Sequence, residues 1–310
     1  MDIKIGNDDN EYFDEITTYK RAIKLMRYEK YNMAVHEFEK LHSNFPENLN
    51  YEYNLCVAYY YNDNYDEAKK GFIKLFDTNN IQYMAESASY LGFICEESNE
   101  IIEAEQWHNK ALELDNSNAS YSNILANFYF NNDQFSDAIP YYLNAIKLSN
   151  HKDPTYFDNL GYLYFSTHDY KNALNYFSIA HQLDPTSPSY NYNIGNTYYH
   201  LHDDIHAYEY ILQTAILSEG ESKYVYKLAQ VCCSLGKFQE ALHYFTDAAT
   251  SSPLKAEYQN ALGNAYMFHN DYENAEKYLK KAVDIEPENL KYNDHYNHLL
   301  LNISKNAGAL

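Results

Sequence analysis

A 34-residue period in the positions of small amino acids constrains this chain more than any other feature. Gly161, Gly195, Ala229 and Gly263 follow one another at intervals of 34 residues, and Ala173, Ala207, Ala241 and Ala275 each lie 12 residues further on. The first half carries the same period less regularly, since Ala68 and Ala104 are 36 residues apart. Each period holds two stretches with apolar residues at helical spacing, joined by a polar turn. This pattern predicts stacked helical hairpins.

The period at 256–289 resembles the tetratricopeptide repeat (TPR) family. The residues that carry the resemblance are Leu262, Gly263, Tyr266, Ala275, Leu279, Ala282 and Pro287. With Gly263 at repeat position 8, eight copies follow: 15–48, 49–82, 85–118, 119–152, 154–187, 188–221, 222–255 and 256–289. The copies depart from the family pattern in three ways. The Trp of position 4 is absent, and the closing Pro is missing at Asn80, Asn116, Asn150 and Glu219. Copy 188–221 also has Asp204 where the others have an aromatic or aliphatic residue.

The resemblance implies an all-α fold, a right-handed α-solenoid of TPR-like helical hairpins with a C-terminal capping helix. Solenoid ends need a cap, and 290–304 is predicted to supply it, with Leu299, Leu300 and Ile303 covering the eighth copy. Residues 1–14 are expected to be an acidic flexible N-terminus, and 305–310 a tail. The register also predicts that Asn144, on a second helix, is exposed.

Charge limits the classes of partner. The chain has 44 acidic and 23 basic residues, for a net charge of −21. Nucleic acid and anionic membrane surfaces are excluded, since both are bound mainly by Lys and Arg. A basic or neutral protein partner is electrostatically easier. There is no apolar run of about 20 residues and no basic-then-apolar leader, so we expect a cytoplasmic protein.

The sequence offers no place for catalysis. Only 35 residues lie outside 15–289, and we find no phosphate-binding Gly loop and no nucleophile motif. We therefore predict a protein that is not an enzyme and has neither cofactor nor metal. His200, His202 and His206, with Asp203 and Asp204 between them, form the one pattern that suggests metal ligation. They flank the predicted turn of the sixth copy, so a polar turn is the preferred interpretation, and a ligand role stays open.

A stripe of amides and tyrosines runs along the first helices, at positions 5, 6 and 9, where a solvated stripe should be charged. In the resembled family this side lines the concave inner surface. Amides pair with extended backbone, and Tyr gives rigid contact area, so we predict a peptide-binding groove. A biased use of Asn and Tyr codons is the alternative explanation. The predicted binding residues are Tyr53, Asn54, Asn123, Asn127, Asn159, Tyr162, Tyr192, Asn193, Asn196, Tyr226, Lys227, Asn260 and Asn264.

The predicted function is non-enzymatic: a co-chaperone-like scaffold or adaptor that binds a peptide or partner segment in the concave groove. The alternative is an accessory or regulatory subunit of an enzyme complex, docked through its outer surface or ends. Some TPR proteins clamp a C-terminal carboxylate with Lys and Asn, and Asn193, Lys223 and Lys227 match part of that clamp. Asp158 stands where the clamp needs a basic residue, so we expect the clamp to be partial at most. The partner and the oligomeric state are not predicted.

Overall fold

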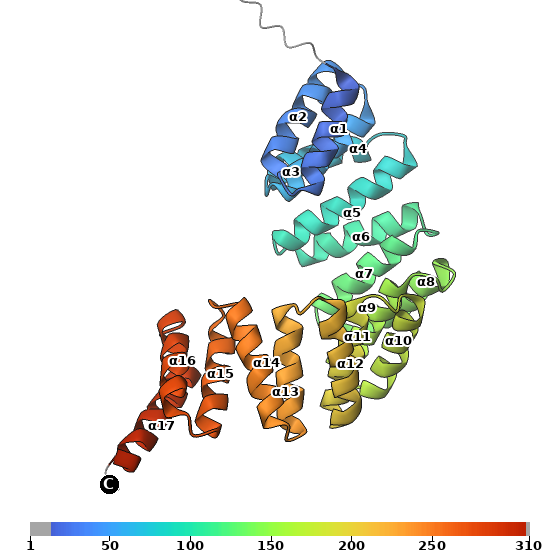
Figure 1. The fold of residues 1–310 in the computed structure, drawn as a ribbon. Helices are drawn as coiled ribbons and strands as arrows, with labels where there is room; N and C mark the ends of the chain where they lie inside the picture. The colour runs from blue at the N-terminus through green and yellow to red at the C-terminus, as the bar shows by residue number, and fades with distance from the viewer. Residues whose placement is uncertain (1–13, 308–310) are drawn as a thin grey trace, which may run out of the picture. The chain divides into compact units, whose positions relative to one another are not determined.

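The computed structural model describes residues 14–307, and this range forms 17 α-helices and no strand (Figure 1). The predicted class, an all-α solenoid of helical hairpins closed by a terminal helix, is confirmed. Of the predicted flexible N-terminus only Asp14 is described, and residues 308–310 of the predicted tail also lie outside the described range. The helices are α1 Glu15–Arg27, α2 Tyr31–Asn44, α3 Leu49–Tyr61, α4 Tyr65–Phe76, α5 Ile81–Glu97, α6 Ile101–Leu114, α7 Ala119–Asn131, α8 Phe135–Leu148, α9 Pro154–Ser166, α10 Tyr170–Leu183, α11 Pro188–His200, α12 Asp204–Leu217, α13 Ser222–Ser234, α14 Phe238–Ser251, α15 Ala256–Phe268, α16 Tyr272–Ile285 and α17 Leu290–Ala307.

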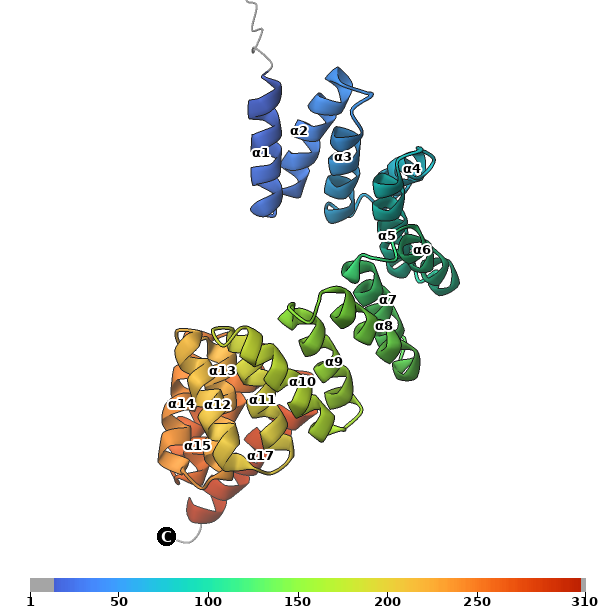
Figure 2. The same ribbon diagram turned by 90° about the vertical axis from the view of Figure 1, so that its right-hand side faces the viewer.

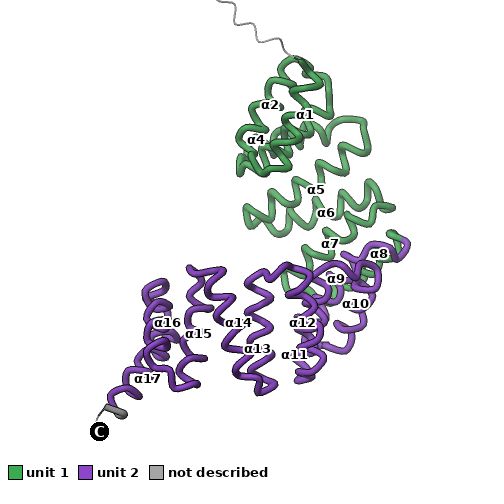
Figure 3. The backbone as a smooth tube through the Cα atoms, in the orientation of Figure 1, with its two compact units in different colours: residues 1–149 green, residues 150–310 purple. Residues whose placement is uncertain are grey.

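The chain divides into two compact units, residues 1–149 with α1–α8 and residues 150–310 with α9–α17 (Figure 3). Within each unit, an odd-numbered helix forms a hairpin with the even-numbered helix that follows it. Each hairpin also packs on the next one in its unit (Figures 1 and 2). A hairpin of this size cannot bury its apolar face alone, so the stacked neighbours supply the rest of the core.

The turn inside each hairpin has the same backbone geometry in all eight cases. Its position 15 residue adopts the left-handed conformation, with φ between 57° and 72°. Most of these residues are Asp, Asn, His or Gly, and Asn, Asp and His are the non-glycine residues found most often in this conformation. The eight are Glu29, Asp63, Asn99, Asp133, His168, His202, Gly236 and Asn270.

Two connections between hairpins also use left-handed residues. They are the connections where the closing Pro is missing at Asn150 and Glu219, and the left-handed pairs are Asn150–His151 and Glu219–Gly220. At Asn80, by contrast, the Asn side chain accepts hydrogen bonds from the first backbone amides of α5 and caps that helix. Different local devices therefore replace the Pro.

Small residues at position 8 let the two helices of a hairpin approach closely. A Cβ atom added at Gly161 would lie 2.7 Å from Cδ1 of Phe177, and one added at Gly263 would lie 2.6 Å from Cγ of Leu279. Both partners stand at position 24 of the same hairpin and are buried. The 34-residue period of small residues therefore comes from repeated close contact between a small and a large side chain.

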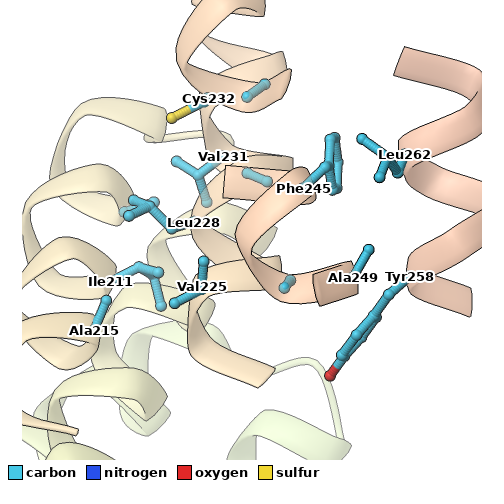
Figure 4. Close-up of a cluster of buried hydrophobic side chains, with 14 residues drawn as sticks. Ile211, Ala215, Val225, Leu228, Val231, Cys232, Phe245, Ala249, Tyr258 and Leu262 are labelled. Atoms are coloured by element: carbon cyan, nitrogen blue, oxygen red, sulfur yellow. The ribbon is translucent and has the colours of Figure 1, made fainter. Parts of the chain in front are cut away.

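The buried side chains form clusters that join successive hairpins. In one of them, side chains from α12, α13, α14 and α15 meet, with Leu228 and Val231 of α13 between Ile211 and Phe245 (Figure 4). Cys232 belongs to this cluster and is buried, so it acts as a small apolar side chain.

Stacked tyrosine pairs account for part of the large number of Tyr residues. Four hairpins place a Tyr at position 11 of the first helix against a Tyr at position 23 of the second, with ring centroids 5.5–5.8 Å apart. Such offset stacking adds to the apolar area that the rings bury. The pairs are Tyr129–Tyr141, Tyr164–Tyr176, Tyr198–Tyr210 and Tyr266–Tyr278.

The structure differs from the sequence expectation at three places. The helix α5 begins at Ile81, ahead of the third predicted copy at 85–118, because Asn80 caps it there. The helix α17 continues to Ala307, past the predicted end at 304. Asn144, predicted to be exposed, is half-buried and donates a 2.8 Å hydrogen bond to Oγ of Ser122.

Candidate functional site

A pocket of about 460 Å³ lies in the second unit, with lining residues from α11, α13, α14, α15 and α17. We call it the unit 2 pocket. Its walls are aromatic and small apolar side chains, with amides and cationic groups among them. It is lined by Tyr199, Tyr226, Gln230, Cys233, Ser234, Phe238, Ala241, Phe245, Asn260, Ala261, Asn264, Ala265, Phe268, His269, Lys291 and His295.

Helical spacing gathers these side chains. On α13, Tyr226 and Gln230 are four residues apart, and Cys233 follows after three more. On α15, Asn260 and Asn264 are likewise four residues apart. Residues three and four apart lie on one face of a helix, so each helix presents a row of side chains to the same space.

A polar cluster joins α15 to α17 at one wall of the pocket. Nδ1 of His295 lies 2.9 Å from Oδ1 of Asn260 and 3.0 Å from Nδ2 of Asn264. A protonated ring nitrogen donates to Asn260, and an unprotonated one accepts from Asn264, so the tautomer decides which amide is paired. Burial lowers the pKa of His295 and favours its neutral ring. Nδ1 of His295 therefore pairs with one of the two amides at a time.

Lys227 provides a half-buried cation beside the pocket. Its Nζ lies 3.9 Å from the ring centroid of Tyr199, one of the lining residues. Among the described residues, no carboxylate lies within ion-pair distance of it. Burial lowers its pKa to about 8, because the charged form loses hydration there. An anion placed next to this amine would gain a Coulombic interaction that no side chain of residues 14–307 supplies.

Phe238 and Phe268 form the exposed apolar part of the pocket. Their ring centroids are 4.4 Å apart, and the two residues remain 39% and 60% exposed. They stand at position 17 of one hairpin and position 13 of the next, and Tyr31–Tyr61 and Tyr170–His200 repeat this contact. Exposed rings at a concave site are typical of binding surfaces.

Three of the predicted binding residues line the unit 2 pocket: Tyr226, Asn260 and Asn264. Asn260 is only 5% exposed, so it is a wall residue rather than a surface one. The others in this unit lie outside the lining. Asn193 donates a 2.7 Å hydrogen bond to Oδ1 of Asp158, and the ring of Tyr192 contacts that of Tyr224.

The remaining three in this unit differ in exposure. Tyr162 is exposed and stacks on Phe165, whereas Asn159 and Asn196 are half-buried.

The predicted binding residues of the first unit take part in its packing. Tyr53 is half-buried among the rings of Phe72, Tyr83 and Tyr90, and burial raises its pKa. Oδ1 of Asn127 accepts a 2.7 Å hydrogen bond from the hydroxyl of Tyr142.

Two amides complete this set. Asn54 donates to the backbone oxygen one turn earlier, at Asn50, and Asn123 is half-buried. The unit 2 pocket brings together none of these four residues.

Several lining residues were not among those predicted. Lys291 and His295 come from α17, which the sequence interpretation treated only as a cap. If the repeat register continues from 290, His295 falls at position 6, the same position as Asn193 and Lys227. Extending the register by one helix would have found it.

The partial carboxylate clamp does not assemble as in the resembled proteins. Lys223 forms an ion pair with Glu221 at 3.1 Å, and Asn193 is bonded to Asp158. Lys223 and Asn193 are thus each bound to a carboxylate, whereas Lys227 contacts none among the described residues.

The three candidate metal-ligating histidines have separate surroundings. His206 Nδ1 lies 2.7 Å from Oδ2 of Asp203, and His200 stacks on Tyr170. His202 is the left-handed residue of its turn. Within residues 14–307, no three or more His, Cys, Asp or Glu side chains gather as a metal site would require. The helices of this range also include none with the length and apolar character needed to cross a bilayer.

Comparisons with known proteins agree with the helical hairpins. The family model for anaphase-promoting complex, cyclosome, subunit 3 matches residues 166–248, and a tetratricopeptide repeat model matches residues 226–289. No curated protein matches the sequence.

Solved structures show the same fold. The crystal structure of yeast Tom70 is 15% identical with a TM-score of 0.68, and the match covers 96% of this chain and 66% of Tom70. A chain of the APC/C hetero-tetramer Cut9-Hcn1 is 16% identical with a TM-score of 0.59, covering 91% of this chain and 55% of that one. PilF of Pseudomonas aeruginosa is 18% identical with a TM-score of 0.58, covering 70% and 99%. This chain thus spans less than two thirds of the chain from the Cut9-Hcn1 structure.

Proposed function

Because the chain is a tetratricopeptide repeat protein, and thus of a scaffold type that binds other proteins, we propose that it binds a segment of a partner protein in the unit 2 pocket. The observation that carries the proposal is the pocket itself, about 460 Å³ with exposed Phe238 and Phe268 and with polar groups at one wall. Pockets that bind ligands combine apolar walls with a few placed polar groups in this way. The proposed role is non-catalytic.

The bound segment would continue along the same side of the neighbouring first helices. Lys227, Asn196 and Tyr162 offer a cation, a half-buried amide and an exposed ring to such a segment. Amides pair with the backbone of an extended peptide, and each net hydrogen bond contributes about 0.5–1.5 kcal/mol. Binding at the four predicted residues of the first unit, and a co-chaperone-like role, stay predictions.

Affinity purification of two matched variants tests the proposal. Phe268→Ala removes an exposed ring from the pocket, whereas Ile205→Ala removes a comparably exposed side chain (66%) from α12, outside the lining. We expect Phe268→Ala to lower capture of the protein's specific partner by about tenfold or more, as truncation of an aromatic anchor does. Ile205→Ala should capture as much as the unchanged chain.

The second candidate function is that of a subunit docked through other surfaces. The match of residues 166–248 to the family of anaphase-promoting complex subunit 3 favours this candidate. It predicts the opposite pattern, in which Phe268→Ala leaves capture unchanged. That result, with the fold of the variant intact by circular dichroism, would remove the pocket as the binding site.

A further inference from the structure

We infer that the segment bound in the unit 2 pocket is anionic and inserts one bulky apolar side chain. This inference rests on the proposed function and specifies the chemistry of the partner. The apolar side chains of the lining support the bulky side chain, and the charges in and beside the pocket support the anionic character of the segment.

The residues that line the pocket indicate that it accepts an apolar side chain. The pocket is lined by the rings of Phe238, Phe245, Phe268 and Tyr226 together with the small side chains of Ala241 and Ala265. The volume of about 460 Å³ lies at the lower end of the range for ligand pockets, roughly 300–1,000 Å³. One ring or branched aliphatic side chain fits a space of that size, and burying an aromatic side chain there would remove about 150–250 Å² of its surface from water.

The absence of acidic residues from the lining indicates that the bound segment is anionic. The chain has 44 acidic residues and a net charge of −21, yet the lining contains no Asp or Glu. It contains the amine of Lys291, and the amine of Lys227 lies next to it over the ring of Tyr199. Two carboxylates outside the lining act on lining residues, Glu257 on the hydroxyl of Tyr226 and Asp294 on His295, whereas Lys227 has no carboxylate within ion-pair distance among the described residues.

The net charge of the chain favours a basic or neutral partner, whereas the lysines in and beside the pocket favour an anionic one. Complementary charges across an interface steer encounter and exclude wrong partners. The acidic remainder of the surface would repel an anionic segment elsewhere, so the pocket is where such a segment gains most. An acidic residue beside the apolar anchor would meet Lys227 or Lys291.

Cys233 supplies a direct reporter of occupancy. It lines the pocket and is half-buried, whereas Cys56, Cys95 and Cys232 are buried. Reaction of Cys233 with a maleimide therefore reports whether the pocket is filled. Three end-blocked peptides are compared on the full chain: Ser-Gly-Asp-Glu-Phe-Asp-Glu-Gly-Ser, the same peptide with Lys at every acidic position, and the same acidic peptide with Ser in place of Phe.

The acidic peptide with Phe should protect Cys233 at a concentration at least tenfold lower than either of the other two. Raised salt should weaken its protection, because exposed charges are screened. Lys291→Met should raise the protecting concentration about threefold to tenfold, whereas Lys280→Met, an exposed lysine on α16, should leave it unchanged. Circular dichroism of both variants verifies that they are folded.

The outcomes separate the two proposals. Equal or better protection by the Lys peptide, or by the peptide without Phe, would show that the pocket binds segments but that the inferred chemistry is wrong. Protection by none of the three, together with unchanged partner capture by Phe268→Ala, would overturn the proposed function as well. Protection that rises with protein concentration in the absence of peptide would identify a second copy as the occupant and overturn the inference.

Discussion

The side-chain amide of Asn193 donates a 2.7 Å hydrogen bond to Oδ1 of Asp158, one repeat earlier in the chain. The same relation recurs at the end of the second unit, where His295 contacts Asn260, also 35 residues earlier. In both cases position 6 of a first helix faces position 5 of the preceding one. Side chains at these positions thus link neighbouring repeats, and only part of each remains available to a partner.

Asp158 should make the stability of the second unit depend on pH. Burial raises the pKa of this carboxyl from 3.8 to about 6, although the bond from Asn193 opposes the shift. Since the folded state binds the proton more tightly, its contribution to stability is largest below about pH 4 and is lost as pH rises through 6. Asp158→Asn should therefore raise the free energy of unfolding at pH 7.5 by about 1–3 kcal/mol, and by much less at pH 4.5.

Urea unfolding at the two pH values measures this difference, with Asp153→Asn as a control for a carboxyl that caps α9 instead. A stability gain that is the same at both pH values would show that the carboxyl of Asp158 does not titrate in this way.

Gly161→Leu should destabilise the second unit through overpacking. An added Cβ would already lie 2.7 Å from the ring of Phe177, which is buried. Forced rotamers and backbone shifts of this kind cost about 1–3 kcal/mol. The better helix propensity of Leu returns less than about 1 kcal/mol. We expect a clear loss in the midpoint of thermal unfolding by circular dichroism.

Asn175→Ala is the control for this overpacking, because Asn175 is exposed on α10, the helix of Phe177. Asn144→Ala is less suitable, because it removes the bond to Ser122. Melting of Gly161→Leu at the temperature of Asn175→Ala would contradict the close approach of α9 and α10.

The features that repeat along the chain could be predicted from the sequence. The small residue at position 8 and the large one at position 24 recur in the sequence because each hairpin needs the same contact. Gly161 with Phe177 and Gly263 with Leu279 show why a period of 34 residues predicts the fold.

The site could be predicted only in part. The periodic pattern shows which side of its own helix a residue occupies, so Tyr226 and Asn264 were placed on the side that lines the pocket. It does not show what the neighbouring helix places opposite, and Asn193 was therefore expected to face solvent, whereas Asp158 accepts its bond. Lys291 and His295 were missed because 290–304 was interpreted only as a cap, whereas α17 packs on α16 and α15 as the first helix of a further repeat would.

Replacing His108 with an apolar residue should lower the free energy of unfolding less than truncating its partner, Glu96. It occupies position 24, where four other hairpins have Phe, and its Nε2 lies 2.6 Å from Oε1 of Glu96. His108→Phe removes a buried Nδ1 that has no hydrogen-bond partner among the described residues, and Glu96 stays partly exposed, so the free energy of unfolding should be unchanged or rise by up to about 2 kcal/mol. Glu96→Ala deprives a buried imidazole nitrogen of its partner and should cost about 1–3 kcal/mol.

Chemical unfolding of both variants, with the exposed Glu97→Ala as the control, tests this order. A larger loss for His108→Phe than for Glu96→Ala would mean that the ring is held by its shape at this position and not by the carboxylate.

The helix α17 should depend on Leu299 far more than on Leu300, although both were predicted to cover the eighth copy. Leu299 is fully buried against Ala275 and Leu279, whereas Leu300 is 40% exposed. Leu299→Ala should therefore cost about 2–5 kcal/mol, as buried Leu truncations do, and Leu300→Ala less than about 1 kcal/mol. Because α17 also carries Lys291 and His295, its loosening should open the unit 2 pocket and speed the labelling of Cys233.

Thermal unfolding and maleimide labelling of the two variants measure both effects. Labelling that accelerates in Leu299→Ala but not in Leu300→Ala would connect the packing of the terminal helix to the integrity of the pocket. Unchanged labelling in Leu299→Ala, despite a lower unfolding midpoint, would show that the pocket keeps its shape without a tightly held α17, and that Lys291 and His295 are peripheral to it.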